Sequence, residues 1–336
     1  MPNLKFEGEA EWLALREMHV GGSEVAALFY QWKTAAGETV VRHMFEPMAE
    51  DDVCLGCLSP YSTGYRLFQE KAGKLKPEDF GSERMDAGTY LESAIAEWSR
   101  KKFDWNLRKV RRYIQHPNHP GWGASLDFEV HEKGRAGWPV EVKNVDGLIY
   151  RDQWVGEGDE IFDWPLHINL QLQHQIGAAE APEGYVVCCV RGNELKRGHI
   201  RRHEATQARI GEAIDMFWQA VDQGADPYWL ADLDTVADLW AVGDAENDEP
   251  LDFAGDEAFS RDLRQAKRWA AHQKFVDGHL KRIKGRIGAA LQDRKKATGA
   301  THRVTWPVIN REAKTVSYVL DAKTYRGGMT ITELKK

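Results

Sequence analysis

The sequence predicts an α/β (α+β) protein with a central mixed β-sheet flanked by helices and a C-terminal extension of helix and β-hairpin. Two observations predict this class. Apolar residues recur with helical spacing before residue 103 and again after residue 165, whereas short apolar runs typical of strands lie between and after them. The composition agrees, because 42% hydrophobic and 29% charged residues are ordinary for a globular chain of one large domain or one domain with an extension.

The first third of the chain is predicted to be mainly helical. Four segments have the required spacing or flanking signals: 10–18, 22–30, 65–73 and 88–102. Ser23 is placed to cap the second of these helices. In the fourth, Leu91, Ile95 and Trp98 recur at helical intervals. Residues 31–60 mix short apolar pieces with acidic ones and predict an inserted loop or short helices.

In the middle of the chain the spacing of apolar residues changes from that of a helix to that of a strand. Three successive strands are predicted there: 109–116, 121–130 and 138–145. After a loop over 146–165, a helix is expected over 165–181 and a buried central strand over 184–192, because the latter is an almost continuous apolar run bounded by glycines. Residues 196–204 are expected to pair beside it, and helix is predicted again over 204–240.

Charge is distributed unevenly over the C-terminal third. Residues 231–260 contain ten Asp and Glu and no Lys or Arg, whereas residues 261–299 contain twelve Lys and Arg and three Asp. We therefore expect an acidic linker over 241–258 and a basic extension over 259–336, with one long helix or a helical hairpin and then a β-hairpin turning at 310–314. The asymmetry favours a nucleic-acid surface although the net charge is −7; the alternative is a solvated helix beside a solvated loop.

Several classes of protein are disfavoured because the sequence lacks their characteristic features. It has no run of eighteen apolar residues and no basic-then-apolar leader, so neither a membrane span nor a secretory signal is expected. Four Cys in 336 residues predict reduced thiols in a cytoplasmic protein. Cys54 and Cys57 have a metal-like spacing, but the other two, Cys188 and Cys189, lie in a predicted buried strand. No phosphate-binding loop of the ATPase type is present.

Three charged residues occupy predicted strand positions: Asp127, Glu141 and Lys143. Glu141 and Lys143 are two residues apart and share a face, which Asp127 can reach if the two strands pair. Neighbouring carboxylates repel unless a cation neutralises them. Mg²⁺ takes carboxylate oxygens, and the backbone carbonyl of Val142 would supply another. Lys143 would then face a scissile phosphate and its attacking water; the alternative is a surface ion pair.

Five motifs in order resemble the PD-(D/E)XK nuclease superfamily and, more closely, the YqaJ-type viral recombinases of the phage lambda exonuclease-like family. They are REMHVGGSE (16–24), SPYSTGYRLFQEKAGKL (59–75), GTYLE (88–92), SLD with EVK (125–127 and 141–143) and LQLQHQI (170–176). The resemblance implies a restriction-endonuclease-like core of a helix, three strands, a helix and a strand. That core would occupy residues 1–240, with an insertion at 31–60.

The resemblance also implies roles for individual residues. It implies metal ligation by Asp127, Glu141, the Val142 backbone carbonyl and Glu92. It implies a catalytic lysine, Lys143, and an orienting residue, Gln171. It implies that the DNA end or its 5′-phosphate is bound by Arg16, Ser23 and Ser125. For Ser23 the alternative is helix capping, and for Gln171 it is a solvated amide.

The function implied is that of a Mg²⁺-dependent deoxyribonuclease, with Mn²⁺ as a substitute. It would be a 5′→3′ exonuclease that resects linear double-stranded DNA for phage-type homologous recombination. A homotrimer, a single-strand annealing partner, and phage or prophage origin in a bacterial cytoplasm are expected with it. Two alternatives keep the residues and change the activity: an endonuclease or single-strand nuclease, and a DNA-binding protein without catalysis.

Three positions depart from the motifs of the family. Leu126 stands where the family has Pro, Phe128 stands where it has Gly, and Ile168 stands where it often has Tyr. None of these changes removes an expected metal ligand, so the chemistry expected of the site is unaltered.

Overall fold

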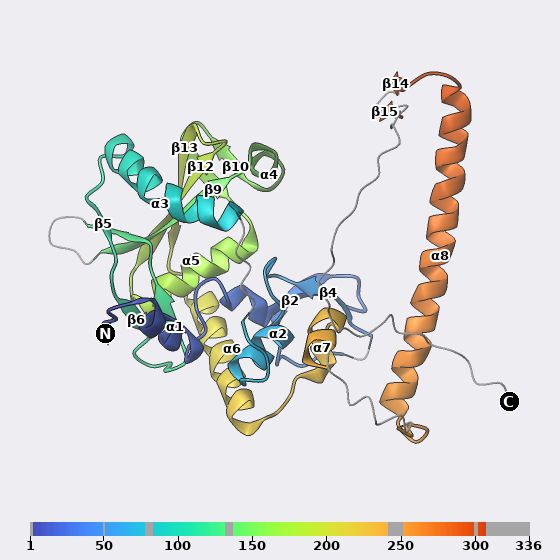
Figure 1. Cartoon of the computed structure of the whole chain (residues 1–336), viewed down its shortest axis with the longest axis horizontal. Coiled ribbons are helices and arrows are strands. Elements are labelled where there is room, and N and C mark those ends of the chain that lie inside the picture. The colour runs from blue at the N-terminus through green and yellow to red at the C-terminus, as the bar shows by residue number, and fades with distance from the viewer. Residues whose placement is uncertain are drawn as a thin grey trace, which may run out of the picture. The chain divides into compact units, whose positions relative to one another are not determined.

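A seven-stranded mixed β-sheet forms the centre of the first part of this computed structural model (Figure 1). The structure describes residues 3–49, 51–77, 83–131, 137–240, 251–298 and 302–306. The chain divides into two units, Met1–Leu239 and Trp240–Lys336. The helices of both units are too short or too polar to cross a membrane, as far as the described ranges extend.

The order of strands in the large sheet is β10-β11-β13-β12-β9-β8-β5. Their bounds are β5 (Leu107–Lys109), β8 (Phe128–Val130), β9 (Trp138–Val145), β10 (Val155–Glu157), β11 (Glu160–Asp163), β12 (Glu183–Val190) and β13 (Glu194–Arg201). β9 and β12 are parallel, whereas β12 pairs antiparallel with β13, and β9 with β8. The apolar run of β12 is central because it is buried on both faces, as predicted.

Helices α3 (Glu83–Lys102) and α5 (Leu166–Ala178) cover opposite faces of this sheet. Tyr185 of β12 faces Trp105, which follows α3, with ring centroids 4.8 Å apart. Val186 and Cys188, whose side chains point the other way, pack with Leu172 and other apolar residues of α5. Glu141 and Lys143 are in register with Val186 and Cys188, so their side chains lie on the α5 face.

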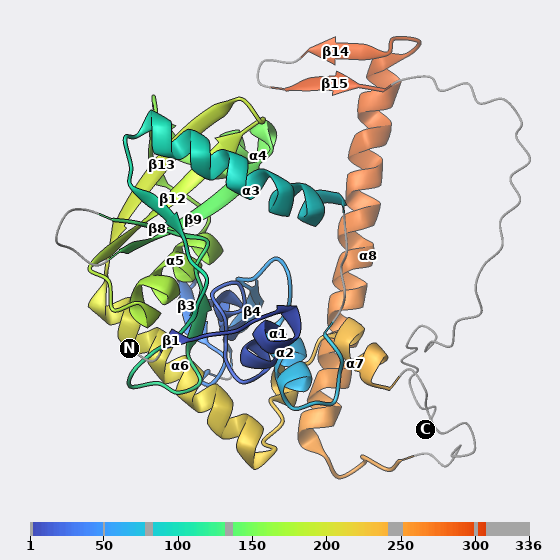
Figure 2. The same ribbon diagram turned by 60° about the vertical axis from the view of Figure 1, so that its left-hand side comes forward.

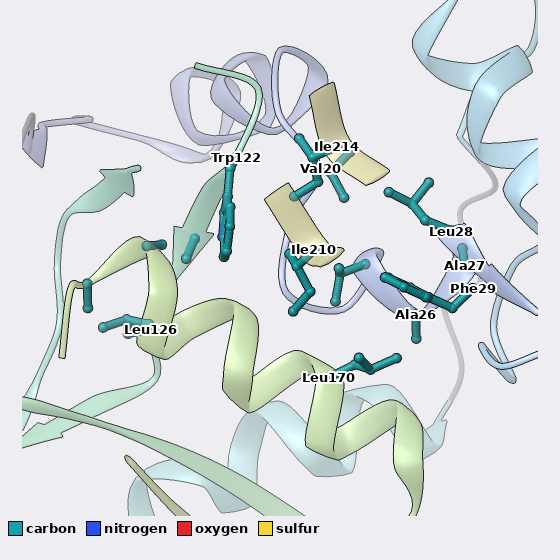
Figure 3. Close-up of a cluster of buried hydrophobic side chains, with 14 of the residues drawn as sticks. Val20, Ala26, Ala27, Leu28, Phe29, Trp122, Leu126, Leu170, Ile210 and Ile214 are labelled. Atoms are coloured by element: carbon teal, nitrogen blue, oxygen red, sulfur yellow. The ribbon is translucent and has the colours of Figure 1, made fainter. Parts of the chain in front are cut away.

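The remaining helical elements of the first unit are α1 (Glu9–Glu17), η1 (Val25–Leu28), α2 (Gly64–Lys71), α4 (Gly147–Gln153), α6 (Glu204–Gln223), η2 (Tyr228–Leu230) and α7 (Leu233–Leu239). A large apolar core joins α5 to α6 and η1 (Figure 3). Leu170 of α5, Ile210 of α6 and Leu28 of η1 are all buried in it. The core fixes α5, and with it the glutamines that face the sheet.

Two small sheets accompany the large one. One has the order β1-β6-β7, with β1 (Asn3–Leu4), β6 (Tyr113–Gln115) and β7 (Gly123–Ser125). The other has the order β3-β2-β4, with β2 (Phe29–Lys33), β3 (Thr39–His43) and β4 (Val53–Cys57). The predicted helix over 22–30 is therefore wrong, because only the 3₁₀ turn η1 is helical there and β2 begins at Phe29. The loop or short helices expected over 31–60 are wrong too, because a hairpin turning at Gly37 (φ +82°) pairs β2 with β3.

Two predicted strands are each divided between two sheets. Residues 109–116 contribute the end of β5 and all of β6, and residues 121–130 form β7 and then β8. The break in the second falls at Leu126 and Asp127, which takes the Asp127 side chain out of a regular ladder. The loop predicted over 146–165 is also wrong, because α4, β10 and β11 occupy it. The strand over 138–145, the helix that begins near residue 165 and the β12–β13 pair are confirmed.

The second unit contains α8 (Glu257–Leu291), one continuous helix rather than a helical hairpin (Figure 2). Its N-cap is Asp256, whose side chain accepts a hydrogen bond from Phe259 N. β14 (Lys296–Thr298) pairs antiparallel with β15 (Arg303–Thr305). The predicted hairpin turn at 310–314 and most of the acidic linker lie outside the described residues.

Candidate active site

Asp127 and Glu141 lie on neighbouring segments of the large sheet, Asp127 directly before β8 and Glu141 within β9. β8 pairs with β9 only through residues 138–140 of β9, and Asp127 lies just before β8. The Asp127 Oδ2 atom accepts a hydrogen bond from the backbone N of Val142 at 3.0 Å. The Asp127 side chain therefore takes the place of a strand partner beside β9. The sequence expectation that Asp127 reaches the EVK strand agrees with this placement.

Glu141 is buried, with 3% of its surface exposed, and polar groups surround its carboxylate. Its Oε1 atom lies 2.6 Å from Lys143 Nζ and accepts a hydrogen bond from Gln171 Nε2 at 2.7 Å. Its Oε2 atom accepts from Gln175 Nε2 at 2.6 Å. Lys143 Nζ also donates to Gln171 Oε1 at 3.2 Å. Gln171 thus bridges Glu141 and Lys143 and fixes their relative position.

Gln175 was missed by the sequence analysis, although a signal for it was present. It lies four residues after Gln171 in α5, so the two amides lie on the same face of the helix. That spacing, together with the expected role of Gln171, predicts a second amide at the same carboxylate.

When both carboxylates are ionised, the charges at this site do not cancel. Asp127 and Glu141 share one close ammonium, that of Lys143. Burial, together with the charge of Glu141, raises the pKa of Asp127 to about 8. Burial acts to lower the pKa of Lys143, but the carboxylates outweigh it and the pKa is raised, so the side chain stays an ammonium at neutral pH. Without another cation Asp127 therefore keeps a proton at neutral pH, and a cation that took the place of this proton would neutralise the second carboxylate.

The oxygen atoms around Asp127 are of the type that a hard divalent cation binds. In a strand, the N–H and C=O of one residue point to the same side, so the Val142 carbonyl faces the side of β9 where Asp127 accepts the Val142 N–H. Two carboxylates and a carbonyl fit Mg²⁺, which retains water and phosphate oxygens as further ligands. Within the described ranges, no three His, Cys, Asp or Glu side chains are gathered to hold a metal, so a zinc site at Cys54 and Cys57 finds no support there.

Glu92 lies on α3 and forms an ion pair with a lysine. Its partner is Lys109 of β5, whose ammonium also lies 4.9 Å from the ring centroid of Phe128. The charge of Glu92 still contributes to the raised pKa of Asp127. Phe128 stands where the family has Gly, and its ring helps to hold Lys109 against Glu92. The role of Glu92 at a metal stays a prediction.

The residues expected at the DNA end are linked through α1. Trp12 Nε1 donates to Ser125 Oγ at 2.7 Å, and the Trp12 ring lies 4.9 Å from the guanidinium of Arg16. Arg16 also forms an ion pair with Glu24 at 3.2 Å. The structure therefore brings Arg16 and Ser125 to one surface. Trp12 was missed by the sequence analysis, although it lies one helical turn before Arg16.

Ser23 is exposed and does not act as the predicted helix cap. The 3₁₀ turn is preceded by Glu24, and no side chain caps it. The adjacent Gly22 packs on α5, because a Cβ there would lie 3.4 Å from Gln171 Cγ and 3.5 Å from Gln175 Cγ. The glycine turn therefore brings Ser23 close to the two glutamines that bind Glu141.

Tyr61 and His167 lie beside Lys143 and were not selected from the sequence. Their rings meet edge to face at 6.0 Å, and Tyr61 is 65% exposed. Burial and the charge of Lys143 lower the pKa of His167. Tyr61 belongs to the SPYST motif, whose resemblance to the family was the available signal.

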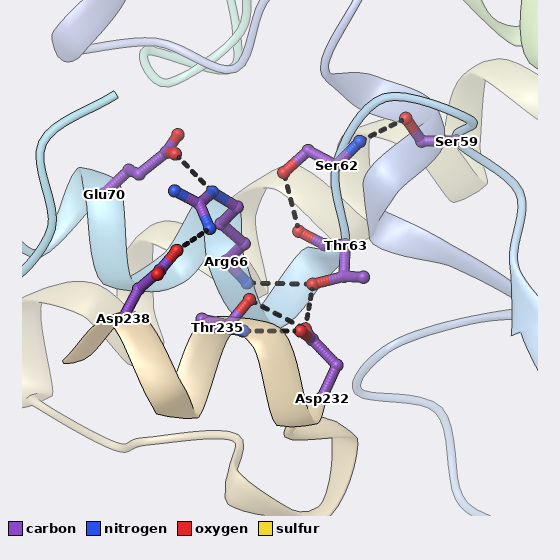
Figure 4. A network of polar contacts seen from close by, with 8 residues as sticks. All are labelled: Ser59, Ser62, Thr63, Arg66, Glu70, Asp232, Thr235 and Asp238. Atoms are coloured by element: carbon purple, nitrogen blue, oxygen red, sulfur yellow. Dashed lines mark hydrogen bonds and ion pairs between the residues drawn. The ribbon is translucent and has the colours of Figure 1, made fainter. Parts of the chain in front are cut away.

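A polar network holds the loop that carries Tyr61 (Figure 4). Thr63 caps α2 and donates through Oγ1 to Asp232 Oδ2 at 2.7 Å, and Thr235 donates to the same carboxylate. Arg66 is held between Glu70 at 3.1 Å and Asp238 at 2.9 Å. The start of α7 and the α2 helix thereby anchor the loop next to Lys143.

Replacement of Gln175 by Ala is expected to affect stability and cleavage together. It would leave Glu141 Oε2 buried without its donor, which costs about 1–3 kcal/mol of unfolding free energy. Gln173→Ala is the matched control, because Gln173 is equally buried in α5 but donates to Arg201 O. Urea unfolding should detect a loss in both variants, whereas single-turnover cleavage should slow only for Gln175→Ala. Equal slowing in both variants would contradict a positioning role.

Comparison with known proteins agrees with the motifs. Residues 49–182 match the model of the YqaJ-like viral recombinase domain. No curated protein sequence matches the chain. Among solved structures, an alkaline exonuclease from Laribacter hongkongensis is similar at 18% identity and a TM-score of 0.46, covering 66% of this chain and 96% of that one. The same enzyme in complex with dAMP gives a TM-score of 0.45. The match to the family model confirms the resemblance predicted from the motifs, and it spans the segment that contains Asp127, Glu141, Lys143 and Gln171.

Proposed function

We propose that this chain is a divalent-metal-dependent deoxyribonuclease that degrades linear double-stranded DNA from its 5′ ends in phage-type homologous recombination. One observation carries the proposal. Asp127, Glu141 and Lys143 meet at one place, with Gln171 bridging the latter two, inside the segment that matches a viral recombinase domain. The reaction is hydrolysis of a phosphodiester bond.

The residues divide the chemistry between them. Asp127, Glu141 and the Val142 carbonyl would hold the cation, Mg²⁺ or in its place Mn²⁺. Such an ion supplies Lewis-acid stabilisation of the negative charge on the phosphate. Lys143 would act as a charged hydrogen-bond donor and not as a base, because Glu141 stabilises its ammonium. In that role it would orient the attacking water and neutralise charge on a phosphate oxygen. Gln171 and Gln175 prevent Glu141 and Lys143 from turning away.

The surface around α1 would receive the DNA end. Arg16 offers a forked donor for a terminal 5′-phosphate, and the Ser125 and Ser23 hydroxyls add hydrogen bonds. Because Arg16 is paired with Glu24 in this structure, binding of the phosphate would require that ion pair to open or be shared. A ring-shaped homotrimer and a single-strand annealing partner belong to the same proposal through the family resemblance.

Digestion of linear and covalently closed DNA tests the proposal. With Mg²⁺ or Mn²⁺, a linear duplex with 5′-phosphates should be shortened, with early release of a 5′-terminal label, while closed circles of the same sequence persist. Cleavage of closed circles would favour an endonuclease on the same residues. Failure to cleave linear, circular and single-stranded DNA alike would favour a DNA-binding protein without catalysis.

A further inference from the structure

The arginines of α8 are segregated from its lysines. The helix carries nine Lys and Arg against three Asp and Glu. At 3.6 residues per turn, all five arginines fall within an arc of about 60°: they are Arg261, Arg264, Arg268, Arg282 and Arg286. The four lysines occupy an arc of about 100° on the other side of the axis: they are Lys267, Lys274, Lys281 and Lys284. We call the first set the arginine stripe.

The arginine stripe is exposed, and most of it is without carboxylate partners. All five side chains are exposed. Among the described residues, only Arg261 has an ion pair, a 3.9 Å contact with the neighbouring Asp262. Several arginines of the first unit are instead paired, as Arg42 is with Asp52 and Arg209 with Glu46. A row of guanidinium groups without counterions attracts an extended anion.

We propose that the arginine stripe binds the phosphate backbone of double-stranded DNA, a role that rests on the nuclease function proposed above. Arg261 and Arg286 are separated by 25 positions, or about 37 Å along a helix. That length is close to one turn of duplex DNA, about 34–36 Å. Arginine suits such a contact because its planar fork binds phosphate through two hydrogen bonds. The contact reads no sequence and would retain the substrate between cleavage events.

The apolar face of α8 gives less support for a second copy of this chain as the occupant. Large apolar residues at unbroken coiled-coil spacing are confined to Val276, Leu280, Ile283 and Ile287, because Gln273 separates them from Trp269 and only the small Ala290 follows them in the pattern. These span about two heptads, whereas a sustained seam has at least three or four. The arginine stripe, in contrast, has members towards both ends of the helix, with Arg261, Arg264 and Arg268 near its start and Arg282 and Arg286 near its end.

Salt dependence of DNA binding tests the proposal in the full chain. The probe is a labelled 40-base-pair duplex in EDTA, which prevents cleavage, with affinity followed by anisotropy from 50 to 200 mM salt. Arg268→Gln/Arg282→Gln should flatten the plot of log affinity against log salt by about 1.8, because each lost phosphate contact contributes about 0.9. Its affinity at 100 mM salt should fall by about tenfold or more.

The matched control removes the same charge from the lysine side. Lys274→Gln/Lys281→Gln should leave the slope nearly unchanged and the affinity within about threefold. Glutamine has nearly the helix propensity of arginine and lysine, and circular dichroism would verify that α8 is intact. Equal losses in both double variants, or none in either, would overturn the proposal. A change in oligomeric mass at unchanged DNA affinity would also overturn it and assign the helix to contacts between copies.

The same measurement separates this inference from the nuclease proposal. If the wild-type chain cleaves no DNA with any divalent metal, the nuclease function fails, while a difference in slope between the two double variants still supports the arginine stripe. If the chain cleaves DNA but the two double variants give the same salt slope, the proposal for the arginine stripe fails and the nuclease function stands.

Discussion

Lys143→Ala is expected to lower the rate of DNA cleavage by about 10²–10³-fold or more, the usual cost of removing one preorganised donor from a transition state. The Lys143 ammonium lies 2.6 Å from Glu141 Oε1 and 3.2 Å from Gln171 Oε1, which hold it at the carboxylate pair. Removal of the ammonium leaves the carboxylates and Gln171 in place but takes away the one positive charge. Single-turnover cleavage of a linear duplex measures the loss.

DNA binding by Lys143→Ala should persist, because Arg16, Ser125 and the arginine stripe are untouched. Lys196→Ala is the matched control. Lys196 of β13 and Lys143 of β9 are both in register with Cys188 of β12, so the two lysines share a face of the sheet. Lys196 donates a hydrogen bond to the Gly158 carbonyl, away from the carboxylate pair. Its replacement should leave cleavage within about twofold of wild type, because no group of the site is removed. Comparable rates for Lys143→Ala and wild type would show that the site is misassigned.

The part of the site predicted from sequence is the part whose spacing is local. Glu141 and Lys143 are two residues apart on one strand, so their common face followed from the period of a strand alone. The addition of Asp127 required only that two consecutive strands pair. The family resemblance then supplied Gln171 from a helix that is distant in sequence. None of these steps required knowledge of how helices pack on the sheet.

The features that were missed depend on packing between distant segments. The approach of Tyr61 and His167 to Lys143 depends on how the loop before α2 is anchored by Asp232, 169 positions later than Thr63. The link from Trp12 to Ser125 likewise spans 113 positions. The small sheet over 29–57 was missed for another reason, because its strands are short and its pattern of buried residues at Phe29, Tyr30 and Trp32 also suits a helix end.

Asp127→Asn is expected to abolish cleavage and, in the absence of metal, to stabilise the folded protein at alkaline pH. In the fold, burial and Glu141 raise the pKa of Asp127 from its usual 3.8 to about 8. Between those two values the folded state keeps a proton that the unfolded state loses, so the free energy of unfolding falls as pH rises. Asparagine still accepts the Val142 N–H bond and carries no charge, so this decline is removed.

Thermal unfolding from pH 5 to pH 8.5 measures this effect directly. In EDTA the melting temperature of Asp127→Asn should exceed that of the wild type by a margin that grows from pH 5 to pH 8.5, since the wild type loses stability as pH rises and about 1 kcal/mol shifts the midpoint by about 2–4 °C in a chain of this size. Asp159→Asn controls for the loss of a surface carboxylate, because Asp159 is exposed and paired with Lys102. It should show no such gain.

Addition of Mg²⁺ or Mn²⁺ at pH 8 should stabilise the wild type more than Asp127→Asn and so narrow the difference between them. A cation that binds the folded wild type at 100 times its Kd adds about 2.7 kcal/mol. Asp127→Asn loses one of the two carboxylates and should gain little, whereas Asp159→Asn should gain as much as wild type. Calorimetric titration with Mn²⁺ gives the same comparison without heating or DNA. Equal stabilisation of Asp127→Asn and wild type by metal would place the cation elsewhere. If the melting temperature of Asp127→Asn depended on pH as that of the wild type does, Asp127 would not be the carboxylate whose pKa is raised.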